Sequence, residues 1–236
     1  ALAPIGDGRY ARVRPSVHRE GFELWEAPTG VANFLDEEEV RSRYYAESAE
    51  LALAATGASR AYVFDHLVRR REEPRPALNF GRGTRGRVAS ANGRIHNDYS
   101  EASGLRRLAL TIPGEDERLR VRRYSIVNIW RPIRGPVLDT PLAVCDARSV
   151  SPDDLVTSEV RYRHRTGEIY FVAYSPAHRW SYFSMMDRDE ALVFKQFDSL
   201  SDVARFTPHA AFDHPGTPHD APLRESIELR CLVTYD

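Results

Sequence analysis

The fold is decided by a segment near the end of the chain, Arg224-Glu225-Ser226-Ile227-Glu228-Leu229-Arg230-Cys231-Leu232-Val233. Successive side chains of a β-strand point to opposite faces, so this segment predicts a strand with one apolar and one polar face. The polar face either meets solvent or lines the inside of a barrel whose apolar outer face packs on helices. The apolar face carries Ile227, Leu229, Cys231 and Val233, and the polar face carries Arg224, Ser226, Glu228 and Arg230.

Further strand-like segments precede this one. They alternate in character or form short apolar runs, and turn residues separate them. A hairpin is expected to turn at Thr166-Gly167. About seven or eight short strands, with helices toward the N-terminal half, predict a mainly β fold with flanking α-helices, a double-stranded β-helix (a cupin-like jelly roll). The segments cover residues 122–133, 141–150, 161–175, 178–186 and 190–198.

The N-terminal half predicts one helix followed by one strand. Asp36 caps the helix, carboxylates crowd its first turn, and Gly57 ends it. Residues 60–70 then alternate as a strand. The segment from Arg71 to Ala91 is rich in Arg, Gly and Pro, and we expect it to be a mobile loop that acts as a lid.

The chain shows no internal repeat and no low-complexity linker. We therefore predict a single domain over residues 1–236. Within it we expect an N-terminal extension of helix and strand over about 1–90 and a jelly-roll core over about 91–236.

Composition excludes several classes of protein. Hydrophobic residues make up 42% and charged residues 28% of the 236 positions, which excludes collagen-like, coiled-coil and disordered chains. A net charge of −1 gives no basic field for nucleic acid or an anionic membrane, so neither is an expected partner. No run approaches the ~18 apolar residues of a membrane helix.

Two residue types bear on the compartment and the source. Cys145 and Cys231 lie in apolar, strand-like runs, which favours reduced core thiols and a cytoplasmic protein over one disulfide. Lys195 is the only lysine among 33 basic residues, and so strong an arginine bias indicates a GC-rich bacterial genome. Lys195 itself is expected to pair with Asp198 or Glu190.

The segment Arg94-Ile95-His96-Asn97-Asp98-Tyr99-Ser100 carries the most chemical information. His96 and Asp98 are two positions apart, so both point to one face of a strand. An imidazole and a carboxylate are two of the three ligands of a facial triad that holds Fe(II) and activates O2. The alternative is that Asp98 only caps the following helix.

A third metal ligand has to come from elsewhere in the chain. The candidates are His178, His209, His214 and His219. His209 is followed about 15 residues later by Arg224-x-Ser226, the separation that suits an iron site using 2-oxoglutarate. The guanidinium of Arg224 would bind the far carboxylate of that cosubstrate, and Ser226 would add a hydroxyl donor.

Taken together, several stretches resemble a known family, namely RIHNDYS, NIWRPI, PLAVCDARSV, HRWSYFSMMDRDEALVFKQFDS, FTPHAAFDHP and PLRESIELR. The family contains the cephalosporin 7α-hydroxylase component of cephamycin biosynthesis and gibberellin-desaturase-like fungal enzymes. The resemblance spans about Tyr62 to Tyr235. It implies a jelly-roll Fe(II)/2-oxoglutarate-dependent oxygenase that hydroxylates, desaturates or cyclises a small molecule in natural-product biosynthesis, with Fe(II), 2-oxoglutarate and O2.

The resemblance also implies roles for individual residues. It assigns the metal ligands to His96, Asp98 and His209, with His178 as the rival third ligand. It assigns the 2-oxoglutarate carboxylate to Arg224. Beside these, Asn128 could hydrogen-bond the cosubstrate or a carboxylate that ligates the metal.

Two other kinds of function remain open at this point. A zinc hydrolase would use the same three ligands with a bound water and a general base. A jelly-roll binding module would leave the His-x-Asp pattern without a role. The expected partner is a small-molecule substrate, and the sequence does not indicate an oligomeric state.

Overall fold

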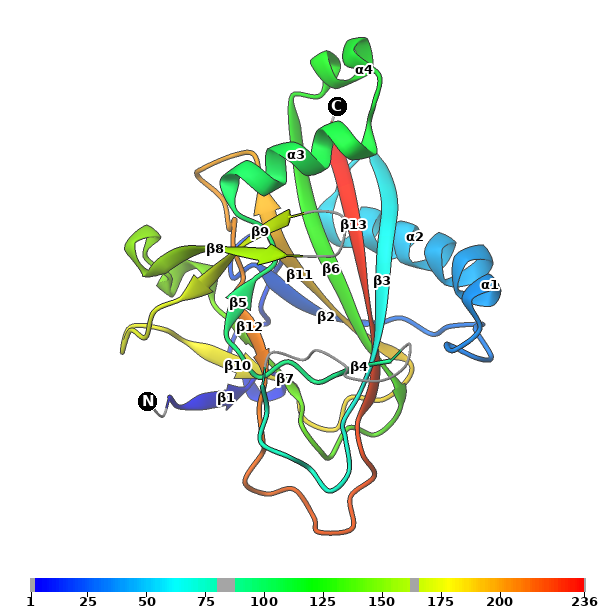
Figure 1. The fold of residues 1–236 in the computed structure, drawn as a ribbon, viewed down its shortest axis with the longest axis vertical. Helices are drawn as coiled ribbons and strands as arrows, with labels where there is room; N and C mark the ends of the chain where they lie inside the picture. The colour runs from blue at the N-terminus through cyan, green and yellow to red at the C-terminus, as the bar shows by residue number, and fades with distance from the viewer. Residues whose placement is uncertain (1–2, 80–87, 162–165, 236) are drawn as a thin grey trace.

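The computed structural model describes residues 3–79, 88–161 and 166–235, and its strands form two sheets (Figure 1). Most of the long strands belong to a six-stranded sheet. This sheet is antiparallel except where its edge strand β4 pairs with β3. In spatial order this sheet contains β2 (Phe22–Glu26), β11 (Glu190–Asp198), β6 (Arg123–Arg134), β13 (Glu225–Tyr235), β3 (Arg60–Arg70) and β4 (Ala89–Ser90).

The second sheet has seven shorter strands. It is antiparallel except where its edge strand β1 joins β10. Its spatial order is β1 (Ile5–Asp7), β10 (Trp180–Tyr182), β7 (Leu142–Cys145), β12 (His209–Ala211), β5 (His96–Asn97), β9 (Thr166–Val172) and β8 (Leu155–Arg161). Two largely antiparallel sheets with few helices make the jelly roll that the sequence predicted.

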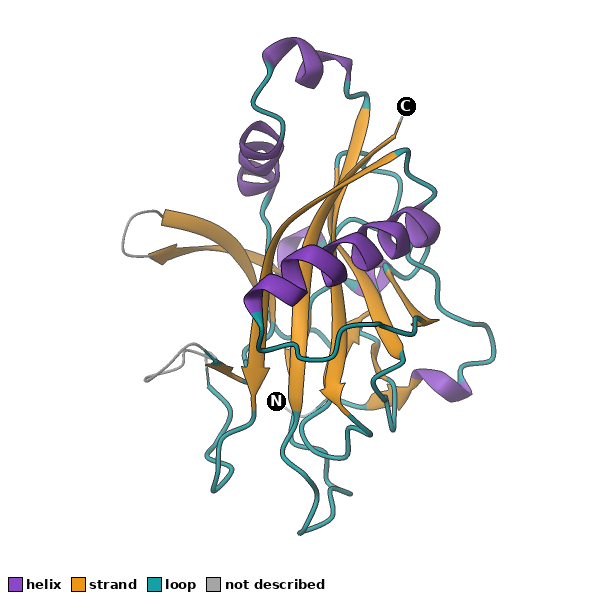
Figure 2. Cartoon of the chain, turned by 90° about the vertical axis from the view of Figure 1, so that its right-hand side faces the viewer, coloured by secondary structure: helices purple, strands orange, loops and turns teal. Residues whose placement is uncertain are grey.

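The N-terminal helix begins and ends where its capping residues predict. The carboxylate of Asp36 accepts hydrogen bonds from the backbone of Glu38 and Glu39, and Gly57 ends the helix at φ 64°. Between these ends the helix has three parts, α1 (Glu37–Glu39), a π-helical turn (Val40–Tyr44) and α2 (Tyr45–Thr56). Figure 2 shows it lying across the long strands.

Two further helices, α3 (Glu101–Thr111) and α4 (Glu115–Arg120), follow strand β5. The hydroxyl of Ser100 caps α3 by accepting a hydrogen bond from the backbone of Ser103. Asp98 therefore does not cap this helix and is free for another role. None of the helices among residues 3–79, 88–161 and 166–235 has the length and apolar character to cross a membrane.

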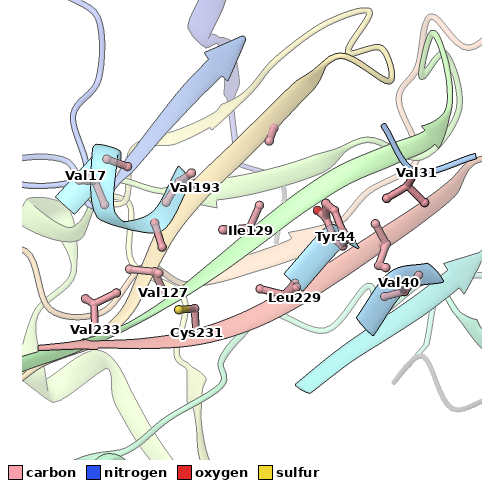
Figure 3. Packing of buried hydrophobic residues seen from close by; sticks show 14 of the residues in the cluster. Val17, Val31, Val40, Tyr44, Val127, Ile129, Val193, Leu229, Cys231 and Val233 are labelled. Atoms are coloured by element: carbon pink, nitrogen blue, oxygen red, sulfur yellow. The ribbon is translucent and has the colours of Figure 1, made fainter. Parts of the chain in front are cut away.

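The main hydrophobic core lies between α2 and one face of the six-stranded sheet (Figure 3). Ile227, Leu229, Cys231 and Val233 of β13 are fully buried there, as the alternation of that strand predicted. Both cysteines are free and buried, which confirms the expected reduced thiols.

The polar face of β13 is buried as well. Arg224, Ser226 and Glu228 are each at most 5% exposed. The structure therefore selects the second of the two interpretations of this face, an interior polar site, because water does not reach it.

The expected boundary near residue 91 is not a boundary in the structure. Strands β2 and β3 precede it and pair with β11 and β13 inside the six-stranded sheet. Residues 1–90 thus provide part of the jelly roll, because strands distant in sequence complete its sheets.

One expectation about a loop needs correction, and a second falls partly outside the described residues. Thr166 and Gly167 do not turn the hairpin, because they pair with Arg161 and Val160 as the start of β9. Residues 162–165, between the two strands, lie outside the described residues. Residues 80–87 of the expected lid, which spans 71–91, also lie outside the described residues. The described part before it is anchored: Arg71 is buried and pairs with Asp213 at 3.0 Å.

Replacing Leu229 by Ala should lower the free energy of unfolding by ~2–5 kcal/mol, because a fully buried leucine under α2 is lost and leaves a cavity. The matched control is Leu119→Ala on α4, which is 78% exposed and should change stability by less than ~0.5 kcal/mol. Urea denaturation midpoints measure both. Equal losses in the two variants would contradict the assigned core.

Candidate metal centre

Three residues from two distant segments of the chain come together between the sheets. In the pairing of β5 with β12, His96 lies directly opposite His209, and their ring centroids are 4.4 Å apart. One ligand atom from each of His96, Asp98 and His209 lies within 4.8 Å of the others. His209 follows Asp98 by 111 positions, and helices α3 and α4 and strands β6 to β11 lie between them, so the long gap in sequence does not separate them in space.

Backbone carbonyls set the tautomers of both histidines. The Nδ1 of His96 lies 2.8 Å from the carbonyl oxygen of Arg94, and the Nδ1 of His209 lies 3.4 Å from that of Thr207. Each Nδ1–H donates to a carbonyl, which leaves the Nε2 lone pairs available. Burial lowers the pKa of His209 to about 3, so its ring is neutral at pH 7, as a metal ligand must be.

The carboxylate of Asp98 is held through one of its oxygens. Its Oδ2 accepts hydrogen bonds from Asn128 Nδ2 and Arg230 Nε, each at 2.9 Å. Its Oδ1 lies 3.3 Å from Nε2 of His96, on the side of the histidines. Burial alone would raise the pKa of Asp98, but the positive charge of Arg230 holds it well below its usual value, so the carboxylate is ionised.

Two buried amides fix the backbone of the His-x-Asp segment. Asn97 is fully buried and donates to the carbonyls of Tyr99 and Gln196. The backbone N–H of Asp98 donates to Oε1 of Gln196 at 2.7 Å. Sequence reasoning missed both residues, although a glutamine inside the otherwise apolar run of β11 was a usable signal.

Two imidazoles and one ionised carboxylate fit ferrous iron. This donor set is the facial triad of non-haem Fe(II) oxygenases, which leaves coordination positions for other ligands. Each of the three side chains also makes a hydrogen bond to the protein through an atom that does not face the cluster, and such bonds orient metal ligands.

The Arg224 guanidinium is a buried cation without an anionic partner. It is 3% exposed, donates through NH1 to the carbonyl of Thr140 at 2.9 Å, and forms no ion pair with any carboxylate in the described part of the chain. Its Nε and the Oγ of Ser226 are buried and have no hydrogen-bond partner there. Burial, together with the nearby Arg69, lowers the pKa of Arg224 to about 9, as expected for a cation that lacks its counter-ion.

Arg224 and the two histidines line one small cavity of about 20 Å³. The ring of Trp130 lies beside Arg224, 5.7 Å from its guanidinium carbon. Ser226 is not among the lining residues, although it is buried on the same strand face. The other lining residues are Arg69, Asn92, Leu142, Ala211 and Glu228.

A second cavity of about 570 Å³ begins at the same cluster. It shares Arg69, Asn92 and His96 with the small cavity and also contacts Asp98. Its volume falls in the range of ~300–1,000 Å³ that is typical of small-molecule sites. Helix α3 and strand β9 form its outer walls.

The remaining candidate residues lie elsewhere. His178 bonds Asp154 through Nε2 at 2.9 Å and packs edge-on against Trp180, which removes it from the cluster. His214 bonds Tyr182. Lys195 is fully buried and pairs with Asp198 at 2.8 Å, as expected.

Comparisons with known proteins agree with this geometry. The family described as "Oxidoreductase/YMDC permease-like domain" matches residues 2–234. The hydroxylase/desaturase CTB9 of Cercospora beticola is 36% identical over 241 residues, which cover 92% of this chain and 71% of that protein. The Fe(II)/2-oxoglutarate-dependent dioxygenase nvfI of Aspergillus novofumigatus is 36% identical over 197 residues, 82% of this chain and 67% of that protein.

A solved structure confirms the fold class. The iron and alpha-ketoglutarate-dependent endoperoxidase NvfI superposes with a TM-score of 0.87 at 29% identity. The match covers 98% of this chain and 84% of that one. The same jelly roll therefore carries enzymes of this oxidative class.

Replacing Arg230 by Met should cost ~3–5 kcal/mol of stability, because the buried carboxylates of Asp98 and Glu228 lose their shared cation. The matched control is Arg70→Met, which breaks a largely exposed pair with Glu225 and should cost at most ~1 kcal/mol. Denaturant titration of both variants checks this. Similar losses would mean that Arg230 is not the compensating charge.

Proposed function

The chain belongs to this oxidoreductase family of Fe(II)/2-oxoglutarate-dependent hydroxylases and desaturases, and from that premise we propose which of its residues carry the reaction. It is a dioxygenase that uses Fe(II), 2-oxoglutarate and O2 and removes hydrogen from a small molecule in natural-product biosynthesis. The zinc-hydrolase and binding-module alternatives are thereby set aside.

His96, Asp98 and His209 hold the iron in this proposal. When bound, Fe(II) with 2-oxoglutarate and O2 supplies the oxidation that breaks a C–H bond. The contribution of the chain is to keep both Nε2 atoms unprotonated and one Asp98 oxygen directed at them. Asn128 and Arg230 orient the Asp98 carboxylate by donating hydrogen bonds to its other oxygen, Oδ2. Asn128 thus acts on the metal-ligating carboxylate rather than on the cosubstrate.

Arg224 binds the far carboxylate of 2-oxoglutarate. The observation that carries this assignment is a buried guanidinium without a counter-ion, in a cavity that His96 and His209 also line. A planar guanidinium binds a carboxylate through two parallel hydrogen bonds, and the unpartnered Nε is available for one of them. Ser226, with its unpartnered hydroxyl, adds a donor at the same end.

The keto-acid end of 2-oxoglutarate would then extend toward the wall that the two cavities share. Trp130 and Leu142 line the small cavity with apolar surface and keep water from the charged end. The large cavity receives the organic substrate beside the metal ligands. The position of the substrate in that cavity decides among hydroxylation, desaturation and ring closure.

Four narrower expectations belong to the same proposal. Two free, buried thiols support a reducing, cytoplasmic location. The relatives CTB9 and nvfI come from fungi. A bacterial source is therefore supported only by the arginine bias of the sequence. The specific likeness to the cephalosporin 7α-hydroxylase likewise stays a prediction, and so does a single domain over the whole chain.

His209→Ala should abolish turnover and remove the weak visible band that forms when 2-oxoglutarate chelates Fe(II) without O2. A lost ligand should weaken iron binding by more than the ~10–100-fold that an outer contact is worth. His178→Ala removes another buried histidine, outside the cluster, and should leave the band intact. A band retained in His209→Ala and lost in His178→Ala would reverse the assignment of the third ligand.

Arg224→Ala should weaken 2-oxoglutarate binding by roughly a hundredfold or more, since one partner of a buried charge pair is worth ~3–5 kcal/mol. Ser226→Ala removes a neutral donor and should cost less, ~1.5–3 kcal/mol. Anaerobic titration of the visible band measures both affinities. Normal affinity in Arg224→Ala would refute the proposed carboxylate site.

A further inference from the structure

One face of helix α3 is turned to the large cavity instead of packing on a sheet. Ser103, Arg106, Arg107 and Leu110 line the cavity and follow one another at intervals of three, one and three positions. Residues so spaced share one face of a helix. Arg106 and Leu110 on this face remain exposed, although α3 begins only three residues after Asp98.

The charges around this cavity do not cancel. Arg230 is compensated by Asp65 and Asp98 at 3.1 and 2.9 Å. Among the described residues, Arg106 and Arg107 form no ion pair with a carboxylate, so α3 brings two uncompensated cations to the cavity wall.

Glu168 is the acidic residue of the opposite wall, on strand β9. Its carboxylate accepts a hydrogen bond from the hydroxyl of Ser100, which caps α3. Its carboxylate is therefore bound at the start of the helix. The two walls carry this one negative charge and the two positive charges of Arg106 and Arg107. The net charge on the two walls is positive.

Arg107 is oriented for an acidic ligand. Its guanidinium carbon lies 4.2 Å from the ring centroid of Phe64, so the guanidinium stacks against an aromatic side chain. A guanidinium held over an aromatic ring keeps its charge and its N–H donors, and it can bind a carboxylate in a bidentate manner. The Nε of Arg107 is shielded from solvent and has no hydrogen-bond partner in the described part of the chain.

The rest of the cavity wall suits an apolar body. Leu67 of β3, Leu110 of α3 and Ile169 of β9 are apolar side chains from three different elements around it. A ligand that satisfies both parts of the cavity has an apolar skeleton and one acidic group.

We propose that the substrate of this enzyme is an organic acid whose carboxylate binds Arg107 and Arg106 of α3, while its apolar skeleton lies over the metal centre. This inference rests on the proposed function only in taking the large cavity as the substrate site. Arg107 is the specificity-determining residue, and Arg106 adds a second positive charge at the solvent side.

The test compares naphthaleneacetate with naphthaleneacetamide, which share a skeleton and differ in charge. Calorimetry on the full chain without metal measures both affinities, so the result does not depend on iron or turnover. The acid should bind about tenfold or more tightly than the amide. In Arg107→Gln the preference should fall below about threefold, and in Arg106→Gln it should fall less. Arg122→Gln, an exposed arginine away from the cavity, should keep the full preference.

Several outcomes would overturn the proposal. These are equal affinities for acid and amide, no binding of either compound at about 1 mM, and an unchanged preference in the Arg106→Gln/Arg107→Gln double variant. A preference lost in Arg224→Gln but kept in Arg107→Gln would place the acid at the cosubstrate end and overturn it too. A failed 2-oxoglutarate titration, in contrast, would count against the proposed function and leave this result standing.

Discussion

The largely buried ion pairs of the Arg230 guanidinium are the interaction on which the interior depends. It contacts carboxylates from three separate elements, Asp98, Asp65 and Glu228, at 2.9, 3.1 and 2.9 Å. Without it, the interior between the sheets would hold like charges in a medium that solvates them poorly. With it, Asp98 stays ionised and keeps one oxygen free, so a polar centre exists inside a largely apolar fold.

Arg224 and Arg230 show how one strand face can serve two purposes. Arg224 directly precedes β13 and Arg230 lies within it, six positions further along the chain. Arg230 is paired by the protein itself, whereas Arg224 contacts a backbone carbonyl and an aromatic ring. The alternation of the strand predicts that both are interior. Only the positions of the carboxylates, two of which come from outside β13, determine which of the two arginines remains available to a ligand.

Local pattern predicted the elements well where a segment's own side chains decide its structure. Strands β3 and β11 and the ends of the capped N-terminal helix lie where alternation and capping put them. Short strands such as β12 were not predicted, because three residues carry no readable period and form a strand only when β5 and β7 flank them. The same holds for Asn97 and Gln196, whose roles follow from a contact across 99 positions.

The elements that hold the metal ligands are not the elements that form the outer walls of the large cavity. His209 and Arg230 belong to sheet strands that have partners on both sides, while α3 and the β8–β9 hairpin lie at the periphery. Mutations in the peripheral elements can therefore reshape substrate choice at little risk to the oxidative machinery. Such a separation makes a fold evolvable, and it is consistent with hydroxylases, desaturases and an endoperoxidase being built on one framework.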